Sequence, residues 1–328
     1  MRTLSIIITV LTMTTSIIGQ QTDNLSHYYL KIKGSKPAKF KIEIGTVVYD
    51  SKMKPTQVEA TDITDISELV IRLEQELGKD GASDRLNVLI HGIWGNYQLA
   101  WKEMVKNLTE NVYIIDDQKQ KVMLSIIWDS SVNYVTGIKI ARHKGDFLGE
   151  LMKSLGKLNN GQTKTTFLCH SMGNRIFQHM ITSSGLLDQD LVSIDQYISA
   201  GADLESDIFE EDKPLHKLPN IVNDIIIFVH NNDRSLGMSK VINRNKRLGL
   251  HGIDNLESKP NNVLQVDVST ITDHLNLPSA ISNHRYFYMN RTIMRDIKRM
   301  IWNQEYLTDK EELEYPNSVK LTQKSSNF

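Results

Sequence analysis

The sequence predicts an α/β protein whose central sheet is predominantly parallel and carries helices on both faces. Two features support this prediction. From Leu86 onward, short apolar runs alternate with stretches whose apolar residues recur at helical spacing. In addition, the apolar run Leu86–Ile90 leads through the glycine-bearing loop His91–Asn96 into a helical stretch at Tyr97–Leu108. A strand, a glycine loop and a helix in this order form the first unit of a parallel sheet.

Two strands and one helix are predicted before this unit. Tyr28–Lys33 and Phe40–Tyr49 have the composition of strands, and the turn-forming stretch Gly34–Pro37 separates them. We therefore expect an opening hairpin. Ile66–Leu77 is predicted as an amphipathic helix, because its leucines recur along one stripe, at Leu69, Leu73 and Leu77.

The remaining elements alternate along the chain and make up a single predicted domain at residues 25–304. Five apolar runs are predicted as strands: Val122–Trp128, Thr165–Cys169, Asp195–Ala200, Asp224–Val229 and Val263–Val268. Three stretches are predicted as helices: Phe147–Leu158, Asn174–Ile181 and Tyr286–Trp302. Ile225–Val229 contains no polar residue, so we expect its strand to be buried on both faces. The polar residues 305–328 are predicted as a mobile tail.

Composition limits the kinds of partner that the protein can have. The chain has 328 residues, with 38 Lys and Arg against 39 Asp and Glu, which gives a formal net charge of −1. A charge of this size produces no field that would attract nucleic acid or an anionic membrane. The single cysteine, Cys169, excludes an intramolecular disulfide. We expect a fold held by its apolar core, acting on a small-molecule or acyl substrate.

Residues 1–19 have the layout of a secretory signal peptide. Met1–Arg2 is a short positive start, Leu4–Ile18 is an apolar stretch, and Gly19 precedes a polar segment. The apolar stretch is too short to span a membrane comfortably. We therefore expect a secreted or periplasmic protein that has no integral membrane association after processing.

Ser171 is the predicted nucleophile. It lies between the strand Thr165–Cys169 and the helix Asn174–Ile181. A sharp strand-to-helix turn holds its residue in a strained conformation with the side chain projecting, and a small residue two positions later lets the backbones pack closely. Gly173 is that small residue. The usual pattern is G-x-S-x-G, and Cys169 replaces its first glycine.

A serine hydroxyl reacts only when a histidine accepts its proton and an acid orients that histidine. In a parallel sheet, catalytic groups gather beyond the carboxyl ends of the strands. Two acids follow strands in this way, and the chain order of serine, acid and histidine favours Asp233 over the alternative, Asp203. Two histidines follow the last predicted strand. The same order favours His284, which directly precedes the final helix, over the alternative, His274.

An oxyanion hole requires two backbone N–H donors that point to where negative charge develops. Met172, which follows the predicted nucleophile, is expected to provide one donor. Ile93 or Trp94 in the H-G-I-W-G loop is expected to provide the other, with His91 bracing the loop through hydrogen bonds. The sequence contains no metal-binding spacing and no phosphate-binding glycine loop with a lysine, so we expect neither a metal nor another cofactor.

These motifs resemble the alpha/beta-hydrolase superfamily, and more closely a bacterial branch of it whose function is unknown. The resemblance covers about Leu86–Trp302 and rests on several ordered motifs: V-L-I-H-G (Val88–Gly92), I-I-W-D-S (Ile126–Ser130), H-S-M-G-N-R (His170–Arg175), S-A-G-A-D (Ser199–Asp203), D-R-S-L (Asp233–Leu236), R-L-G (Arg247–Gly249) and H-R-Y-F (His284–Phe287). It implies an alpha/beta-hydrolase fold with a sheet of about eight strands. It also implies a catalytic triad of Ser171, Asp233 and His284. The sequence departs from the branch at Cys169 and at H-G-I-W-G, where the branch usually has H-G-F or H-G-Y.

The leading hypothesis is a serine hydrolase that acts on a carboxylic ester, thioester or amide through an acyl-enzyme intermediate. Two alternatives stay open. The first is a catalytically inactive binding module, because a fold alone does not guarantee its chemistry. The second is an acyltransferase, which the same residues could form if water were excluded from the site.

Overall fold

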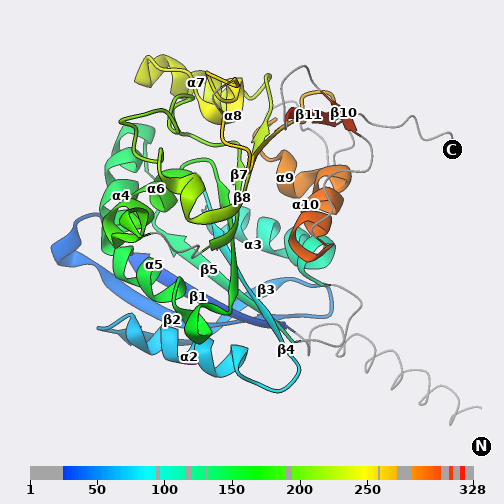
Figure 1. The fold of residues 1–328 in the computed structure, drawn as a ribbon. Helices are drawn as coiled ribbons and strands as arrows, with labels where there is room; N and C mark the ends of the chain where they lie inside the picture. The colour runs from blue at the N-terminus through cyan, green and yellow to red at the C-terminus, as the bar shows by residue number, and fades with distance from the viewer. Residues whose placement is uncertain are drawn as a thin grey trace, which may run out of the picture.

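An 11-stranded sheet forms the centre of the described part of the chain (Figure 1). The computed structural model describes residues 25–93, 97–114, 120–130, 132–189, 194–257, 259–271, 283–303, 310–312 and 318–321. The predicted signal peptide, Trp94 and His274 therefore lie outside the described residues.

The strands follow the order β10-β11-β9-β8-β7-β6-β4-β5-β1-β2-β3 across the sheet. Neighbouring strands are parallel from β11 through to β1, and the three remaining pairings, β1 with β2, β2 with β3 and β10 with β11, are antiparallel. The strands are β1 (Leu25–Lys33), β2 (Lys41–Tyr49), β3 (Pro55–Ile63), β4 (Ala82–Ile90), β5 (Gln120–Trp128), β6 (Lys164–His170), β7 (Ile194–Ala200), β8 (Val222–Val229), β9 (Val263–Asp267), β10 (Lys310–Glu312) and β11 (Ser318–Leu321).

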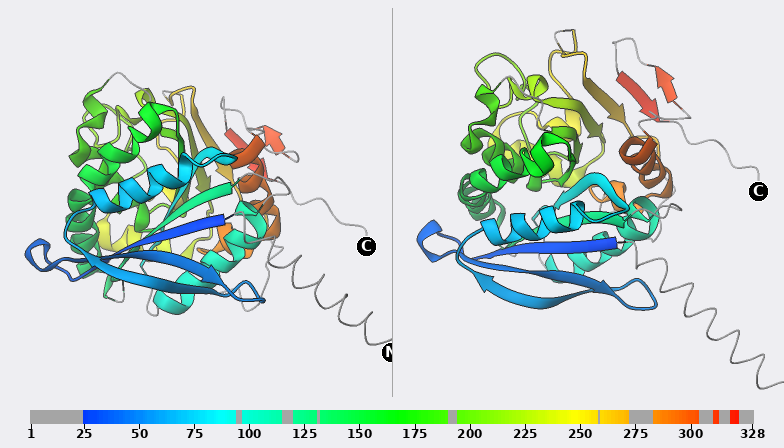
Figure 2. Two further views of the ribbon diagram at one scale, coloured as in Figure 1. Left: turned by 90° about the horizontal axis from the view of Figure 1, so that it is seen from below. Right: turned by 60° about the horizontal axis from the view of Figure 1, so that its bottom comes forward.

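Helices cover both faces of this sheet (Figure 2). They are α2 (Ser67–Leu77), α3 (Tyr97–Leu108), α4 (Tyr134–Phe147), α5 (Gly149–Leu155), α6 (Gly173–Ser184), α7 (Arg234–Asn243), α8 (Leu248–His251), α9 (Tyr286–Met289) and α10 (Arg291–Asn303). Short helical turns complete the list: η1 (Pro37–Lys39), η2 (Thr109–Tyr113), η3 (Leu158–Gly161), η4 (Leu186–Asp188) and η5 (Leu218–Asn220).

The core consists of two apolar clusters, one on each face of the sheet. Helices α2, α4, α5 and α6 pack into the first cluster, and α3, α9 and α10 pack into the second. Alternate residues of β8 point to opposite faces. Ile225 and Ile227 therefore belong to the first cluster, whereas Ile226 and Phe228 belong to the second. Burial on both faces explains why this strand is continuously apolar from Ile225 to Val229.

These observations confirm the predicted fold class, and the eight predicted strands correspond to β1, β2 and β4 to β9. The sheet is larger than predicted by three strands, which lie at or next to its two edges. Two of them, β10 and β11, fall within residues 305–328, which the sequence predicts as a mobile tail. Ser318 and Val319 are buried where β11 pairs with β9, and β10 pairs with β11, so these residues form part of the sheet. The third, β3, has only its two end residues, Pro55 and Ile63, buried.

Within the described residues, no helix has the length and apolar composition needed to cross a membrane.

Candidate active site

Ser171 occupies a strained turn between β6 and α6. Its backbone has a φ of +53°, in the left-handed region that non-glycine residues rarely adopt. Two hydrogen bonds hold this conformation: the Ser171 N–H donates to the carbonyl of Ala200 at 3.0 Å, and the side-chain amide of Asn174 donates to the Ser171 carbonyl at 3.0 Å. Since strain of this kind persists only where the surroundings enforce it, the turn is a fixed feature of the fold.

Two glycines leave the space that the turn requires. A Cβ atom at Gly173 would lie 2.4 Å from the carbonyl oxygen of Ile90, so α6 can begin only where this residue has no side chain. A Cβ atom at Gly92 would lie 2.7 Å from the Cβ of Ser171. The loop after β4 therefore touches the serine directly.

Asp233 contacts His284 beyond the carboxyl end of β8. The Nδ1 atom of His284 lies 2.5 Å from Oδ2 of Asp233. The other oxygen, Oδ1, accepts a hydrogen bond from the backbone N–H of Leu236 at 3.0 Å and so caps α7. The carboxylate is buried, whereas the His284 ring keeps some contact with solvent. A carboxylate at Nδ1 favours the tautomer that has its proton there, which leaves Nε2 of His284 able to accept a proton.

The backbone at Gly201 passes directly behind this pair. Its φ is +52°, and a Cβ atom there would lie 3.3 Å from Nδ1 of His284 and 3.6 Å from Oδ2 of Asp233. The hydroxyl of Tyr286 accepts the Gly201 N–H at 2.6 Å and donates to the carbonyl of Phe228 at 3.1 Å. Tyr286 thus ties the segment that carries His284 to the ends of β7 and β8.

The side chain of His170 contacts the backbone of His284. The sequence does not predict this contact. The Nε2 atom of His170 lies 2.8 Å from the carbonyl oxygen of His284, to which it donates. The ring centroid of His170 lies 4.7 Å from that of His284 and 4.6 Å from that of Phe287. Burial, and then the proximity of His284, hold the pKa of His170 well below its usual value. His170 is therefore a neutral packing and positioning group.

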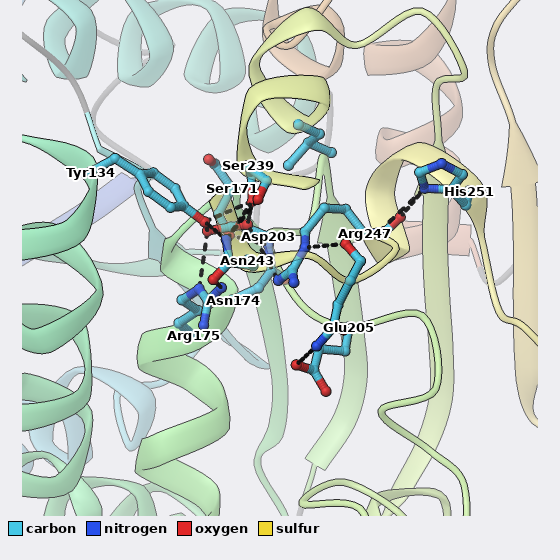
Figure 3. Close-up of polar contacts among 12 residues, drawn as sticks. Tyr134, Ser171, Asn174, Arg175, Asp203, Glu205, Ser239, Asn243, Arg247 and His251 are labelled. Atoms are coloured by element: carbon cyan, nitrogen blue, oxygen red, sulfur yellow. Dashed lines mark hydrogen bonds and ion pairs between the residues drawn. The ribbon is translucent and has the colours of Figure 1, made fainter. Parts of the chain in front are cut away.

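Asp203, the alternative acid, takes part in a different set of contacts (Figure 3). Its Oδ2 accepts hydrogen bonds from the Tyr134 hydroxyl at 2.7 Å and from Nε of Arg175 at 3.0 Å, and its Oδ1 accepts one from Ser239. Nη1 of the buried Arg247 lies 3.8 Å from Oδ1. The backbone N–H of Asp203 donates to the Ser171 carbonyl at 3.3 Å. Asp203 therefore supports the turn and belongs to a buried charge cluster, while His284 reaches Asp233.

His91 braces the loop after β4, as the sequence predicts. Its Nδ1 lies 2.7 Å from the carbonyl oxygen of Gly92, and its Nε2 accepts the backbone N–H of Trp128 at 3.1 Å. The indole N–H of Trp128 donates to the His91 carbonyl at 2.8 Å. Burial lowers the pKa of His91 to about 4, so its ring is neutral at physiological pH.

Ile93 and Met172, two of the residues predicted to form the oxyanion hole, meet against α4. A Cβ atom at Gly137 would lie 2.6 Å from Cδ1 of Ile93 and 3.0 Å from the sulfur of Met172. The loop after β4 and the first residue after the serine therefore lie side by side. The third predicted residue, Trp94, lies outside the described part of the chain, as does the alternative base, His274. Among the described residues, no group of three His, Cys, Asp or Glu side chains converges in a way that could hold a metal ion.

The fold and the strained serine turn define the class of protein: a predominantly parallel sheet with helices on both faces and a strand-to-helix turn of this kind are those of an alpha/beta hydrolase. Residues 70–302 match the model of a family described as alpha/beta hydrolase of unknown function (DUF900), and the chain belongs to that family. A comparison with curated proteins found no match.

Proposed function

We propose that the protein is a serine hydrolase that cleaves a carboxylic ester, thioester or amide through an acyl-enzyme intermediate. The observation that carries this proposal is the 2.5 Å contact between His284 and the buried carboxylate of Asp233, on the same edge of the sheet as Ser171. In the proposed mechanism Ser171 is the nucleophile, His284 is the general base and Asp233 is the acid that orients it.

The first half of the reaction forms the acyl-enzyme. The hydroxyl oxygen of Ser171 attacks the acyl carbon as Nε2 of His284 takes the hydroxyl proton. The resulting imidazolium donates that proton to the leaving alcohol, thiol or amine as the bond to the acyl carbon breaks. Asp233 stabilises the positive charge that forms on the His284 ring, because its carboxylate lies against Nδ1.

The second half returns the enzyme to its starting state. His284 removes a proton from a water molecule, whose oxygen attacks the acyl carbon. The ester to Ser171 then breaks, and the serine oxygen takes back a proton from His284. In both halves the negative charge on the substrate oxygen would be stabilised by the backbone N–H of Met172 and by one from the loop at Ile93 and Trp94. The proximity of Ile93 to Met172 supports this assignment.

Reaction with a fluorophosphonate probe tests the proposal, because this reagent forms a covalent bond only with an activated serine. We expect labelling of the wild-type protein at Ser171, identified by peptide mass spectrometry. Ser171→Ala should lose the label and reduce ester turnover by about 10⁴-fold or more, with a nearly unchanged melting temperature. Absence of labelling in the wild-type protein would favour an inactive binding module. Labelling combined with acyl transfer to an added alcohol in preference to water would favour an acyltransferase.

We also propose that the protein is secreted or periplasmic, because residues 1–19 have the layout of a signal peptide. Mass spectrometry of the mature protein tests this proposal. The expected result is an N-terminus close to Gly19, and an intact Met1 on soluble protein from the cytoplasm would contradict it.

A further inference from the structure

Helix α7 carries an apolar face that is open to solvent. The side chains of Met238, Val241 and Ile242 are 68%, 76% and 50% exposed. Positions three and four apart lie on the same side of a helix, so the three side chains form one surface. In the part of the chain that the structure describes, six large apolar side chains are exposed, and this one helix carries half of them.

The inward face of α7 is largely polar. Leu236, Ser239 and Asn243 point inward, and two of these three residues are polar. The side chains of Ser239 and Asn243 each lie 2.7 Å from the Tyr134 hydroxyl. A surface helix in a soluble protein normally has the opposite arrangement, because its apolar stripe faces the core. The outward apolar residues of α7 therefore contribute nothing to the core.

Positive charge surrounds this apolar face. The segment from Arg234 to Ile253 contains five Lys or Arg residues and no Asp or Glu. Four of the five are exposed: Arg234, Lys240, Arg244 and Lys246. One of them is partly neutralised from outside the segment, since Lys246 lies 2.8 Å from a carboxylate oxygen of Asp254. The formal net charge of the chain is only −1, so this positive charge is a local feature that the overall composition conceals.

We propose that this face of α7, formed by Met238, Val241, Ile242 and the exposed cations Arg234, Lys240 and Arg244, docks the protein onto the surface of an anionic phospholipid bilayer. Apolar side chains on a helix insert at the level of the headgroups, while nearby Lys and Arg attract anionic lipids. This local attraction modifies the expectation from net charge that the protein ignores anionic membranes. A second copy of the chain fits this face less well, because a two-fold contact would bring the same cations together.

Docking in this way would place the proposed active site next to the membrane. α7 begins directly after its cap, Asp233, and its underside contacts the Asp203 cluster that supports the Ser171 turn. In Figure 1, α7 lies at the outer end of the molecule, beyond the carboxyl ends of β7 and β8. The docking proposal does not depend on catalysis, since none of the lipid-facing residues takes part in the proposed reaction.

Sedimentation with vesicles tests the proposal. The full chain should sediment with vesicles that contain phosphatidylglycerol but not with vesicles of phosphatidylcholine alone, and added salt should weaken the binding. Val241→Ser should reduce the vesicle partition coefficient about tenfold through lost apolar contact. Arg244→Asn, which suits the left-handed backbone at this position, should reduce it about fivefold through lost charge.

Ile71→Ser provides a matched control. Ile71 is 52% exposed on α2, which lies at the opposite end of the molecule from α7 in Figure 1. This variant should bind anionic vesicles as the wild type does. Ser171→Ala should also bind normally, so that a failure of docking can be told apart from a failure of the proposed hydrolase chemistry.

Two results would overturn the proposal. The first is absence of binding to anionic vesicles, or equal binding by the wild type, Val241→Ser and Arg244→Asn when all three have the same melting temperature. The second is self-association of the wild type that Val241→Ser abolishes, because the face would then be an interface between copies of the chain.

Discussion

Asp233 accepts a hydrogen bond from Nδ1 of His284 with one carboxylate oxygen and caps α7 with the other. The orientation of the carboxylate is therefore determined by the start of a helix as well as by its histidine partner. An acid held at both oxygens presents a fixed acceptor to the imidazole. Because Asp233, and not Asp203, contacts His284, substitution of these two candidate acids should have different consequences.

Asp233→Asn should leave the protein folded and nearly inactive. Asparagine is an effective helix cap, so the melting temperature should change little. The amide would favour the wrong tautomer of His284, and turnover should fall by about 10⁴-fold. Ester turnover and thermal unfolding measure the two effects separately.

Asp203→Asn serves as the comparison for that variant and should have the opposite profile. Removal of this carboxylate leaves Arg175 and Arg247 without their shared negative partner, which should cost about 3 kcal/mol of unfolding free energy. Turnover of the folded fraction should change far less. A stable but inactive Asp203→Asn, together with an active Asp233→Asn, would identify Asp203 as the catalytic acid.

Gly92→Ala should lower activity because the added methyl group would lie 2.7 Å from the Cβ of Ser171. The serine or the loop would have to move, and we expect a loss in kcat of about 10²-fold, as is typical of a misplacement of about 1 Å. Gly237→Ala is a suitable control. An added Cβ at Gly237 meets nothing within 4 Å, so the variant should keep full turnover and stabilise α7 by about 0.5 to 1 kcal/mol. Equal turnover of the two variants would show that the contact between the loop and the serine has no catalytic consequence.

His170→Phe should weaken catalysis through the position of His284. Phenylalanine keeps the contact with Phe287 but cannot donate to the His284 carbonyl. Loss of one hydrogen bond of about 1 to 1.5 kcal/mol corresponds to a roughly tenfold lower kcat if the histidine becomes misaligned. His170→Gln retains an amide donor and should recover part of the loss, while KM changes little in either variant. If both variants keep the wild-type kcat and only melt earlier, His170 has a purely structural role.

His27 should make stability depend on pH. It is buried on β1, with Nδ1 2.5 Å from the Tyr49 hydroxyl and Nε2 2.8 Å from the Ser125 hydroxyl, and burial lowers its pKa to about 3. Between that pKa and the unfolded value of about 6.5, the unfolded chain binds the proton and the folded chain does not. The contribution of buried, neutral His27 to the free energy of unfolding is therefore complete above about pH 6.5 and declines as the pH falls towards 3.

His27→Gln isolates this contribution from that of the carboxylates. The difference in unfolding free energy between the wild type and the variant should shrink by about 3 kcal/mol from pH 7 to pH 4. Denaturant unfolding at several pH values measures it. A difference that stays constant over this range would show that His27 does not titrate with the shift expected from its burial.

The sequence predicts the interior of the sheet well and its edges poorly, for a physical reason. Interior strands such as β8 must be apolar on both faces, which leaves a clear signal. β3 is an exposed, polar edge strand that is held mainly by backbone hydrogen bonds, so its side chains carry little information. β10 and β11 are only three and four residues long, which is too short for an alternating pattern to be clear in the sequence.

Helices α4 and α7 are not predicted from the sequence, because the residues of each depart from the pattern that is usual in helices. Glycine normally disfavours a helix, yet Gly145 lets α4 approach α6, where an added Cβ would lie 2.4 Å from the Cβ of His179. α7 has Met238, Val241 and Ile242 on its outer face and only Leu236 as a large apolar residue on its inner face, so its pattern does not indicate a helix packed on the core. For both helices, the sequence does not show which surface the helix lies against.

The candidate site also has one part that the sequence predicts and another part that it does not. The turn at Ser171 leaves a local signature, because strand, serine, glycine and helix are contiguous in the chain. The choice between Asp233 and Asp203 depends on which acid the histidine reaches in space, and both acids follow strands. The contact between His170 and the carbonyl of His284 joins residues 114 positions apart and uses a backbone atom, so side-chain types alone do not reveal it.

Tyr286 lies two residues beyond His284 in the chain. Its hydroxyl links the backbone N–H of Gly201 to the carbonyl of Phe228. The segment that carries His284 and the turn at Ser171 are thereby both tied to the carboxyl ends of the parallel strands. The backbone of the proposed base, His284, is therefore aligned when the chain folds. A substrate entering this site would meet groups that are already oriented, and little reorganisation would remain for the moment of bond cleavage.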